Sequence, residues 1–137
     1  MGGSDALART MKERWDPAKT VVIALDTLTN GTLSYFVAEG DVVRTWIPSD
    51  LLGAMKAVRP QLSPFDPPLG GTDAQAFLAH GWQACSVICV DPAYGTPREY
   101  HQMTDTPDRL DPTQLADSID YAEALVREIA RRRLGAA

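Results

Sequence analysis

A short apolar run of mostly β-branched residues constrains the fold of this chain more than any other feature. Residues 20–25 (Thr-Val-Val-Ile-Ala-Leu) lack the polar–apolar alternation of a strand with one face in water. Such a run predicts a strand buried on both faces, as in the interior of an α/β sheet. The run ends at Asp26, which places a carboxylate where the strand leaves the core.

Helices and further strands are predicted along the rest of the chain. We expect helices over 4–15, 48–58, 73–80 and 111–135, strands over 33–37 and 84–90, a weaker strand or extended segment over 42–47, and an ordered surface loop or a linker over 59–72. The last helix has the clearest start, because Asp111 can cap it, Pro112 suits its first position and Gln114 can reach back to the amide of Asp111. This order predicts an α/β fold with helices packed on a mixed sheet.

Composition excludes several classes of protein. With 137 residues, of which 45% are hydrophobic and 23% charged, the chain is expected to form a single soluble domain over 1–137. The net charge of -5 argues against binding to nucleic acid or to an anionic membrane surface. The basic cluster over 131–133 ends the last helix, where it complements the helix dipole.

No segment predicts targeting to a membrane or export. No apolar run approaches the roughly 20 residues that span a bilayer, and the N-terminus lacks the features of a signal peptide. Cys85 and Cys89 lie in one predicted strand, roughly 13 Å apart, which is too far for a disulfide. We expect both thiols to be small buried groups and favour a cytoplasmic location.

Two polar side chains stand where predicted strands end. Asp26 follows the run over 20–25, and His101 lies in the long loop that follows the strand over 84–90. Ligands of open α/β sheets bind at strand ends, so both side chains could face one cleft. The residues alone also allow Asp26 as an ordinary turn residue and His101 as a hydrogen-bonded loop residue. His80, beside Gly81, is predicted to be a polar helix end rather than a ligand.

Three segments of the sequence resemble motifs of one enzyme family. They are Ile23-Ala24-Leu25-Asp26-Thr27, then Gly71-Thr72-Asp73-Ala74-Gln75-Ala76-Phe77 with Gly81-Trp82-Gln83-Ala84-Cys85-Ser86, and Tyr100-His101-Gln102-Met103-Thr104-Asp105-Thr106. They resemble the strand-end aspartate motif, the Gly-Ser-Asp-His segment and the Tyr-His-Thr-x-x-Asp-Thr signature of the co-catalytic, two-zinc aminopeptidases. That family also includes glutaminyl cyclases and glutamate carboxypeptidases. The order and spacing of the segments agree with the family.

The resemblance implies a fold, a cofactor and a set of site residues. The fold would be the second, C-terminal half of a zinc aminopeptidase-type domain, with a three-layer αβα structure around a mixed sheet. Asp26 and His101 would each be a ligand of a different zinc in a two-zinc pair. Asp73 and Asp105 would be supporting polar groups, and Thr27 and Tyr100 would border the pocket of a peptide-like substrate. In such enzymes the metals polarise the scissile carbonyl and activate water.

The chain departs from the family pattern in its metal ligands. The family's further elements lie upstream and comprise a histidine ligand, a bridging aspartate and an adjacent glutamate pair. This sequence has no Glu-Glu pair, and its two histidines are His80 and His101, whereas catalytic zinc usually takes three protein ligands. We therefore expect a portion of an aminopeptidase-type hydrolase that is inactive alone.

Other interpretations remain open. The chain could be a non-catalytic binding or scaffolding module that retains the fold, or an unrelated small α/β domain whose motif matches are coincidental. Half of a larger sheet would leave an open strand edge and uncovered apolar helix faces, which invite pairing. We therefore expect a homo-oligomer or a complex with a complementary chain.

Overall fold

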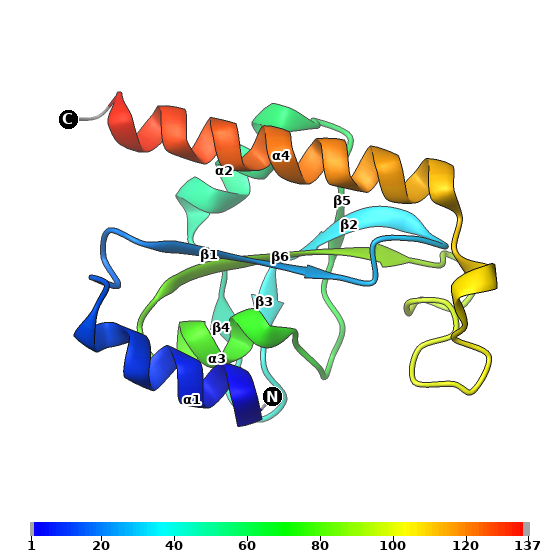
Figure 1. Cartoon of the computed structure of the whole chain (residues 1–137), viewed down its shortest axis with the longest axis horizontal. Helices are drawn as coiled ribbons and strands as arrows, with labels where there is room; N and C mark the ends of the chain where they lie inside the picture. The colour runs from blue at the N-terminus through cyan, green and yellow to red at the C-terminus, as the bar shows by residue number, and fades with distance from the viewer. Residues whose placement is uncertain (1, 136–137) are drawn as a thin grey trace.

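The computed structural model describes residues 2–135, in which a mixed four-stranded sheet lies between two layers of helices (Figure 1). Helices α2 (Ser49–Val58) and α4 (Pro112–Leu134) cover one face, and helices α1 (Gly2–Thr10) and α3 (Asp73–Ala79) cover the other. The predicted three-layer αβα fold with a mixed sheet is thus confirmed.

Strand β6 (Gln83–Val90) is the centre of the sheet, whose order is β1-β6-β2-β5. It pairs in parallel with β1 (Val21–Asp26) and antiparallel with β2 (Thr32–Phe36), and β2 pairs in parallel with β5 (Ser63–Phe65). Because β1 and β6 run parallel, with Asp26 opposite Ile88, the loops that follow them leave the same edge of the sheet.

Strand β1 lies at the edge of the sheet. It pairs with β6 on one side, and no strand within residues 2–135 pairs with its other side. Its side chains are half-buried, apart from Leu25, which is 49% exposed. The prediction of an interior strand buried on both faces is therefore wrong, because β1 pairs with β6 alone within residues 2–135 and its side chains remain partly in solvent.

The core joins both helical layers to the sheet. On one side, Tyr121 of α4 packs in the core with Met55 of α2, and its hydroxyl donates a hydrogen bond to the Met55 carbonyl oxygen at 3.3 Å. On the other side, the Trp82 indole N–H donates to the Ala8 carbonyl oxygen at 2.8 Å and so fixes α1 against the loop before β6. Cys85 and Cys89 are free thiols and fully buried, as predicted.

Several short elements refine the predicted order. Strands β3 (Ala38–Glu39) and β4 (Thr45–Trp46) form a separate hairpin, so only part of the segment 42–47 is a strand. The loop over 59–72 contains β5, which sequence analysis missed because of Pro64. That proline is tolerated because β5 is an edge strand, where a missing N–H breaks no ladder hydrogen bond. Short 3₁₀ helices η1 (Met11–Glu13) and η2 (Pro107–Arg109) complete the structure.

No helix within residues 2–135 is both long enough and apolar enough to cross a bilayer.

Candidate functional site

A strained turn follows β1 directly. Thr27 has a φ of 46°, in the left-handed region that β-branched residues rarely adopt. Its hydroxyl donates to Oδ1 of Asp26 at 2.9 Å, and its carbonyl oxygen accepts the Cys89 N–H at 2.8 Å. The turn therefore holds the Asp26 carboxylate against the end of the sheet. Backbone strain of this kind persists where the surrounding contacts enforce it, which is common at functional sites.

The loop that carries His101 is also folded by left-handed residues. Glu99 and His101 have φ values of 60° and 56°. The imidazole of His101 stacks on the ring of Tyr100, with centroids 3.9 Å apart and planes 18° apart. Glu99 accepts a hydrogen bond from the Thr104 hydroxyl and pairs with Arg109 at 3.5 Å. These contacts turn the chain back on itself around the exposed His101.

Asp73 reaches the site from the first turn of α3. The preceding residue, Thr72, caps this helix, because its side-chain oxygen accepts the Ala74 N–H at 3.1 Å. Thr72 is buried and Asp73 is exposed, so the cap is fixed in the core while the carboxylate meets solvent. Asp105 lies in the loop that carries His101 and is exposed as well.

These segments enclose a polar cleft of about 550 Å³. All six site residues predicted from the sequence line it, namely Asp26, Thr27, Asp73, Tyr100, His101 and Asp105. Five further residues also line the cleft, namely Thr29, Asn30, Gly71, Thr72 and Arg98. The fold thus brings the predicted residues together, while their chemical roles stay predictions.

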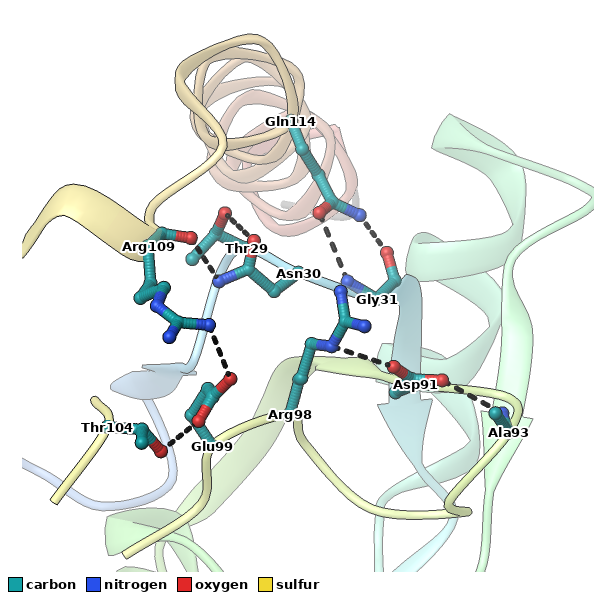
Figure 2. A network of polar contacts seen from close by, with 10 residues as sticks. All are labelled: Thr29, Asn30, Gly31, Asp91, Ala93, Arg98, Glu99, Thr104, Arg109 and Gln114. Carbon is teal, nitrogen blue, oxygen red and sulfur yellow. Dashed lines mark hydrogen bonds and ion pairs between the residues drawn. The ribbon is translucent and has the colours of Figure 1, made fainter. Parts of the chain in front are cut away.

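Two hydrogen bonds join the loop after β1 to the end of the loop that carries His101, and Figure 2 shows the one between Asn30 and Arg109. The Asn30 side-chain amide donates to the Arg109 carbonyl oxygen at 2.8 Å. The Thr29 hydroxyl accepts the Asp111 N–H at 3.0 Å. The two sides of the cleft are therefore held in a fixed relation to each other.

Gln114, in the first turn of α4, makes a further contact with the loop after β1 (Figure 2). Its Oε1 accepts the Gly31 N–H at 3.1 Å, and its Nε2 donates to the Gly31 carbonyl oxygen. The prediction that Gln114 reaches back to the amide of Asp111 is wrong, because the Asp111 N–H donates its hydrogen bond to the Thr29 hydroxyl.

Residue 31 must be glycine, since a Cβ there would meet the Val90 carbonyl carbon at 2.6 Å.

An apolar pocket of about 130 Å³ adjoins the polar cleft. Phe36, Phe65 and Ile88 line it, and the two phenyl rings meet edge to face with centroids 5.0 Å apart. The pocket and the cleft share Asp26, Gly71, Thr72 and Tyr100 as lining residues. The site therefore offers carboxylates and an imidazole on one side and an apolar surface on the other.

The described residues do not complete a zinc site. Within 2–135, no group of three or more histidine, cysteine, aspartate or glutamate side chains is placed to hold one metal ion. Catalytic zinc usually takes three protein ligands. Carboxylate and imidazole are suitable ligand types, but too few of them converge, so no catalytic step through a metal follows from these residues alone.

Sequence reasoning missed Arg98 and the residues that hold the cleft together. Arg98 lines the cleft beside Tyr100, and its Nε lies 3.4 Å from Oδ2 of Asp91. The pair Asn30-Gly31 is typical of a turn, but this local pattern carries no information on the distant partner of the Asn30 side chain.

The chain matches a known family of enzymes. The family model described as Peptidase family M28 matches residues 1–126, which include all three motif segments and all six predicted site residues. No curated protein and no solved structure matches the chain.

Proposed function

Because the chain belongs to peptidase family M28, the co-catalytic zinc aminopeptidases that its motifs resemble, we propose that it is the C-terminal portion of a zinc-dependent aminopeptidase-type hydrolase. The observation that carries this proposal is that Asp26 and His101, from distant parts of the sequence, line the same cleft. The family match supports the reaction class, which is hydrolysis of a peptide-like substrate.

In this proposal Asp26 supplies a carboxylate and His101 an imidazole, each to one of two zinc positions. When bound, zinc supplies a Lewis acid and an activated water. The Thr27 hydroxyl orients the Asp26 carboxylate through its hydrogen bond at 2.9 Å. Tyr100 limits the rotation of the His101 ring by stacking on it. Thr27 and Tyr100 border the substrate, and Asp73 and Asp105 support the site from the cleft wall.

Residues 1–137 are not expected to hydrolyse peptides alone. The described residues 2–135 do not contain a complete set of metal ligands. The sequence also has no adjacent glutamate pair, which would supply the general base and a further ligand. The proposal therefore requires that these groups come from residues outside this chain segment or from a second chain.

A zinc titration by calorimetry on the metal-stripped protein tests the proposal. If a second copy of the chain completes the site, zinc is expected to bind with micromolar affinity, and Asp26→Ala and His101→Ala are each expected to abolish binding at the zinc position to which that residue contributes. His80→Gln and Asp16→Asn are matched controls, because neither residue lines the cleft and each has its own local partner, Asp5 for His80 and the Ala18 N–H for Asp16.

Absence of zinc binding by the wild-type protein would overturn the form of this proposal in which a second copy of the chain completes the metal site. It would favour the second candidate, a non-catalytic binding or scaffolding module that retains the fold. The observation in favour of that candidate is the incomplete set of metal ligands within residues 2–135. Binding that Asp26→Ala and His101→Ala leave unchanged would also contradict the proposal, because the metal would then lie elsewhere.

We also propose that the free edge of β1 pairs with a partner, either a second copy of this chain or a complementary chain. The residues from Val21 to Leu25 are uncharged and include no proline, so the edge lacks the features that usually prevent strand pairing. Leu25 is half-exposed at this edge, and Ile119 and Val126 are half-exposed on α4. These apolar side chains are consistent with a surface that a partner covers.

A further inference from the structure

We propose that Glu39 is a positioning residue, whose buried carboxylate fixes the segment 70–73 that forms one wall of the cleft. This inference rests on the proposed function in one respect, which is that the cleft is taken as the functional site. Glu39 lines neither the cleft nor the apolar pocket, so it acts through the residues that it contacts.

The burial of Glu39 is the first observation. Glu39 lies in β3 and is 0% exposed. Glutamate is rarely buried completely unless its charge is paired, yet none of the ion pairs within residues 2–135 involves Glu39. A carboxylate in such a place requires hydrogen-bond donors to replace its lost hydration.

The hydrogen-bond donors around the carboxylate are the second observation. Oε2 accepts the Thr72 N–H at 2.7 Å, and Oε1 accepts the hydroxyl of Ser86. The Thr72 hydroxyl lies 3.2 and 3.1 Å from the two carboxylate oxygens and 2.7 Å from the Ser86 hydroxyl. Thr72 and Ser86 are themselves buried. The Thr72 N–H and the hydroxyls of Thr72 and Ser86 therefore replace the hydration that the carboxylate loses on burial.

The backbone next to Glu39 holds the other end of the same wall. The Gly40 N–H donates to the Gly70 carbonyl oxygen at 3.1 Å, and Oδ1 of Asp41 accepts the Gly70 N–H at 2.6 Å. The turn 39–41 therefore forms hydrogen bonds with the segment 70–73 at both Gly70 and Thr72. Asp73, which lines the cleft, is the next residue along the chain after Thr72.

The wall segment separates two cavities. Gly71 and Thr72 line both the polar cleft and the apolar pocket, whereas Asp73 lines the polar cleft alone. Thr72 also caps α3 by accepting the Ala74 N–H. A shift of Thr72 would therefore displace Asp73 and change the boundary between the polar and apolar parts of the site.

Amide hydrogen exchange on the metal-free protein tests this inference by NMR. Glu39→Gln keeps the size of the side chain but replaces one acceptor oxygen with a donor. We expect the Thr72 and Asp73 amides to exchange at least about tenfold faster relative to the Val87 amide of β6. Ser86→Ala, which removes one donor and should fold readily, is expected to act in the same direction with a smaller effect.

Ile129→Val is the control for general loss of stability, because Ile129 lies in the core on α4, away from the wall segment. It should raise exchange without singling out residues 72 and 73. Unchanged exchange in both Glu39→Gln and Ser86→Ala, or an equal increase across β6, would overturn the inference.

Zinc titration of the same variants separates this inference from the proposed function. If the wild-type protein binds zinc, Glu39→Gln is expected to weaken binding about tenfold, and to have no further effect in an Asp73→Asn background. A wild-type affinity in Glu39→Gln would overturn the positioning role. If the wild-type protein binds no zinc, a site completed by a second copy is excluded, and the exchange measurement alone decides the role of Glu39.

Discussion

The side-chain amide of Asn30 donates a hydrogen bond to the backbone carbonyl oxygen of Arg109 at 2.8 Å, and this bond joins the two loops that form the cleft. Asn30 lies after β1 with a φ of 59°, a left-handed conformation that asparagine tolerates better than most residues. One residue therefore serves two purposes, because the side chain that suits this backbone also reaches the other loop.

Replacing Asn30 should show both contributions. Asn30→Ala is expected to lower the free energy of unfolding by about 2 kcal/mol, from the lost hydrogen bond and the poor fit of alanine to a positive φ. Asn30→Gly is expected to cost about 1 kcal/mol, since glycine accepts the backbone conformation and only the hydrogen bond is lost. Urea unfolding measures both values, and equal losses in the two variants would contradict the role of the backbone.

Gln114→Ala should weaken the contact between the start of α4 and the loop after β1. It removes both hydrogen bonds to Gly31 and is expected to lower the free energy of unfolding by about 1–2 kcal/mol. Thr113→Ala is the matched control, because Thr113 also lies in the first turn of α4, is exposed, and should change the free energy by less than about 0.5 kcal/mol. Similar losses of unfolding free energy in the two variants would show that Gln114 contributes to the stability of the helix and not through its hydrogen bonds to Gly31.

Local patterns predicted much of the fold. The apolar runs of β1 and β6 identified two strands, and Asp111 with Pro112 identified the start of α4. The Asp111 side chain does accept the Thr113 N–H at 2.9 Å, as a capping residue should. Signals of this kind depend on neighbours in the sequence, so they can be read without the folded structure.

Contacts between distant residues were not predictable in the same way. Gln114 has the spacing of a capping box, but its partner is Gly31, which is 83 residues away in the sequence. Strand β1 has the composition of an interior strand, but its place at the edge depends on which strands are available to pair. Each outcome was decided by packing between segments, for which the sequence contains no local signal.

The candidate site also combines residues that local motifs predicted with a residue that they did not. The six predicted residues came from short motif segments, and the fold brings those segments to one cleft. Glu39 lies outside every motif, and nothing in its local sequence separates a buried carboxylate from a surface one. Only the burial of its hairpin against Thr72 and Ser86 distinguishes it.

A charge at the free edge of β1 should prevent association. We expect the wild-type chain to be a dimer at micromolar concentration by light scattering, and Leu25→Lys to be a monomer, because lysine at an edge strand opposes strand pairing. Leu25 is half-exposed, so the substitution should not unfold the chain. Val42→Lys is the control, since Val42 is 96% exposed in the β3–β4 hairpin. A wild-type monomer would contradict pairing with a second copy.

Stability should fall at alkaline pH because of the buried thiol of Cys85. Burial, assisted by the negative charge of Glu39, raises the pKa of Cys85 from 9.0 to about 12. The raised pKa favours the thiol in the folded state, so this contribution to stability is complete below about pH 8.5 and is lost as the pH rises toward 12.

Comparison with Cys85→Ala isolates this effect from other groups that titrate in the same range. That variant loses a constant amount of packing energy but no longer titrates at this position. The free energy of unfolding of the wild-type protein should therefore approach that of the variant by up to about 1.4 kcal/mol per pH unit above pH 9. Urea unfolding between about pH 7 and 10 measures the difference. A difference that does not change with pH would mean that the Cys85 thiol ionises as readily in the folded chain as in the unfolded chain.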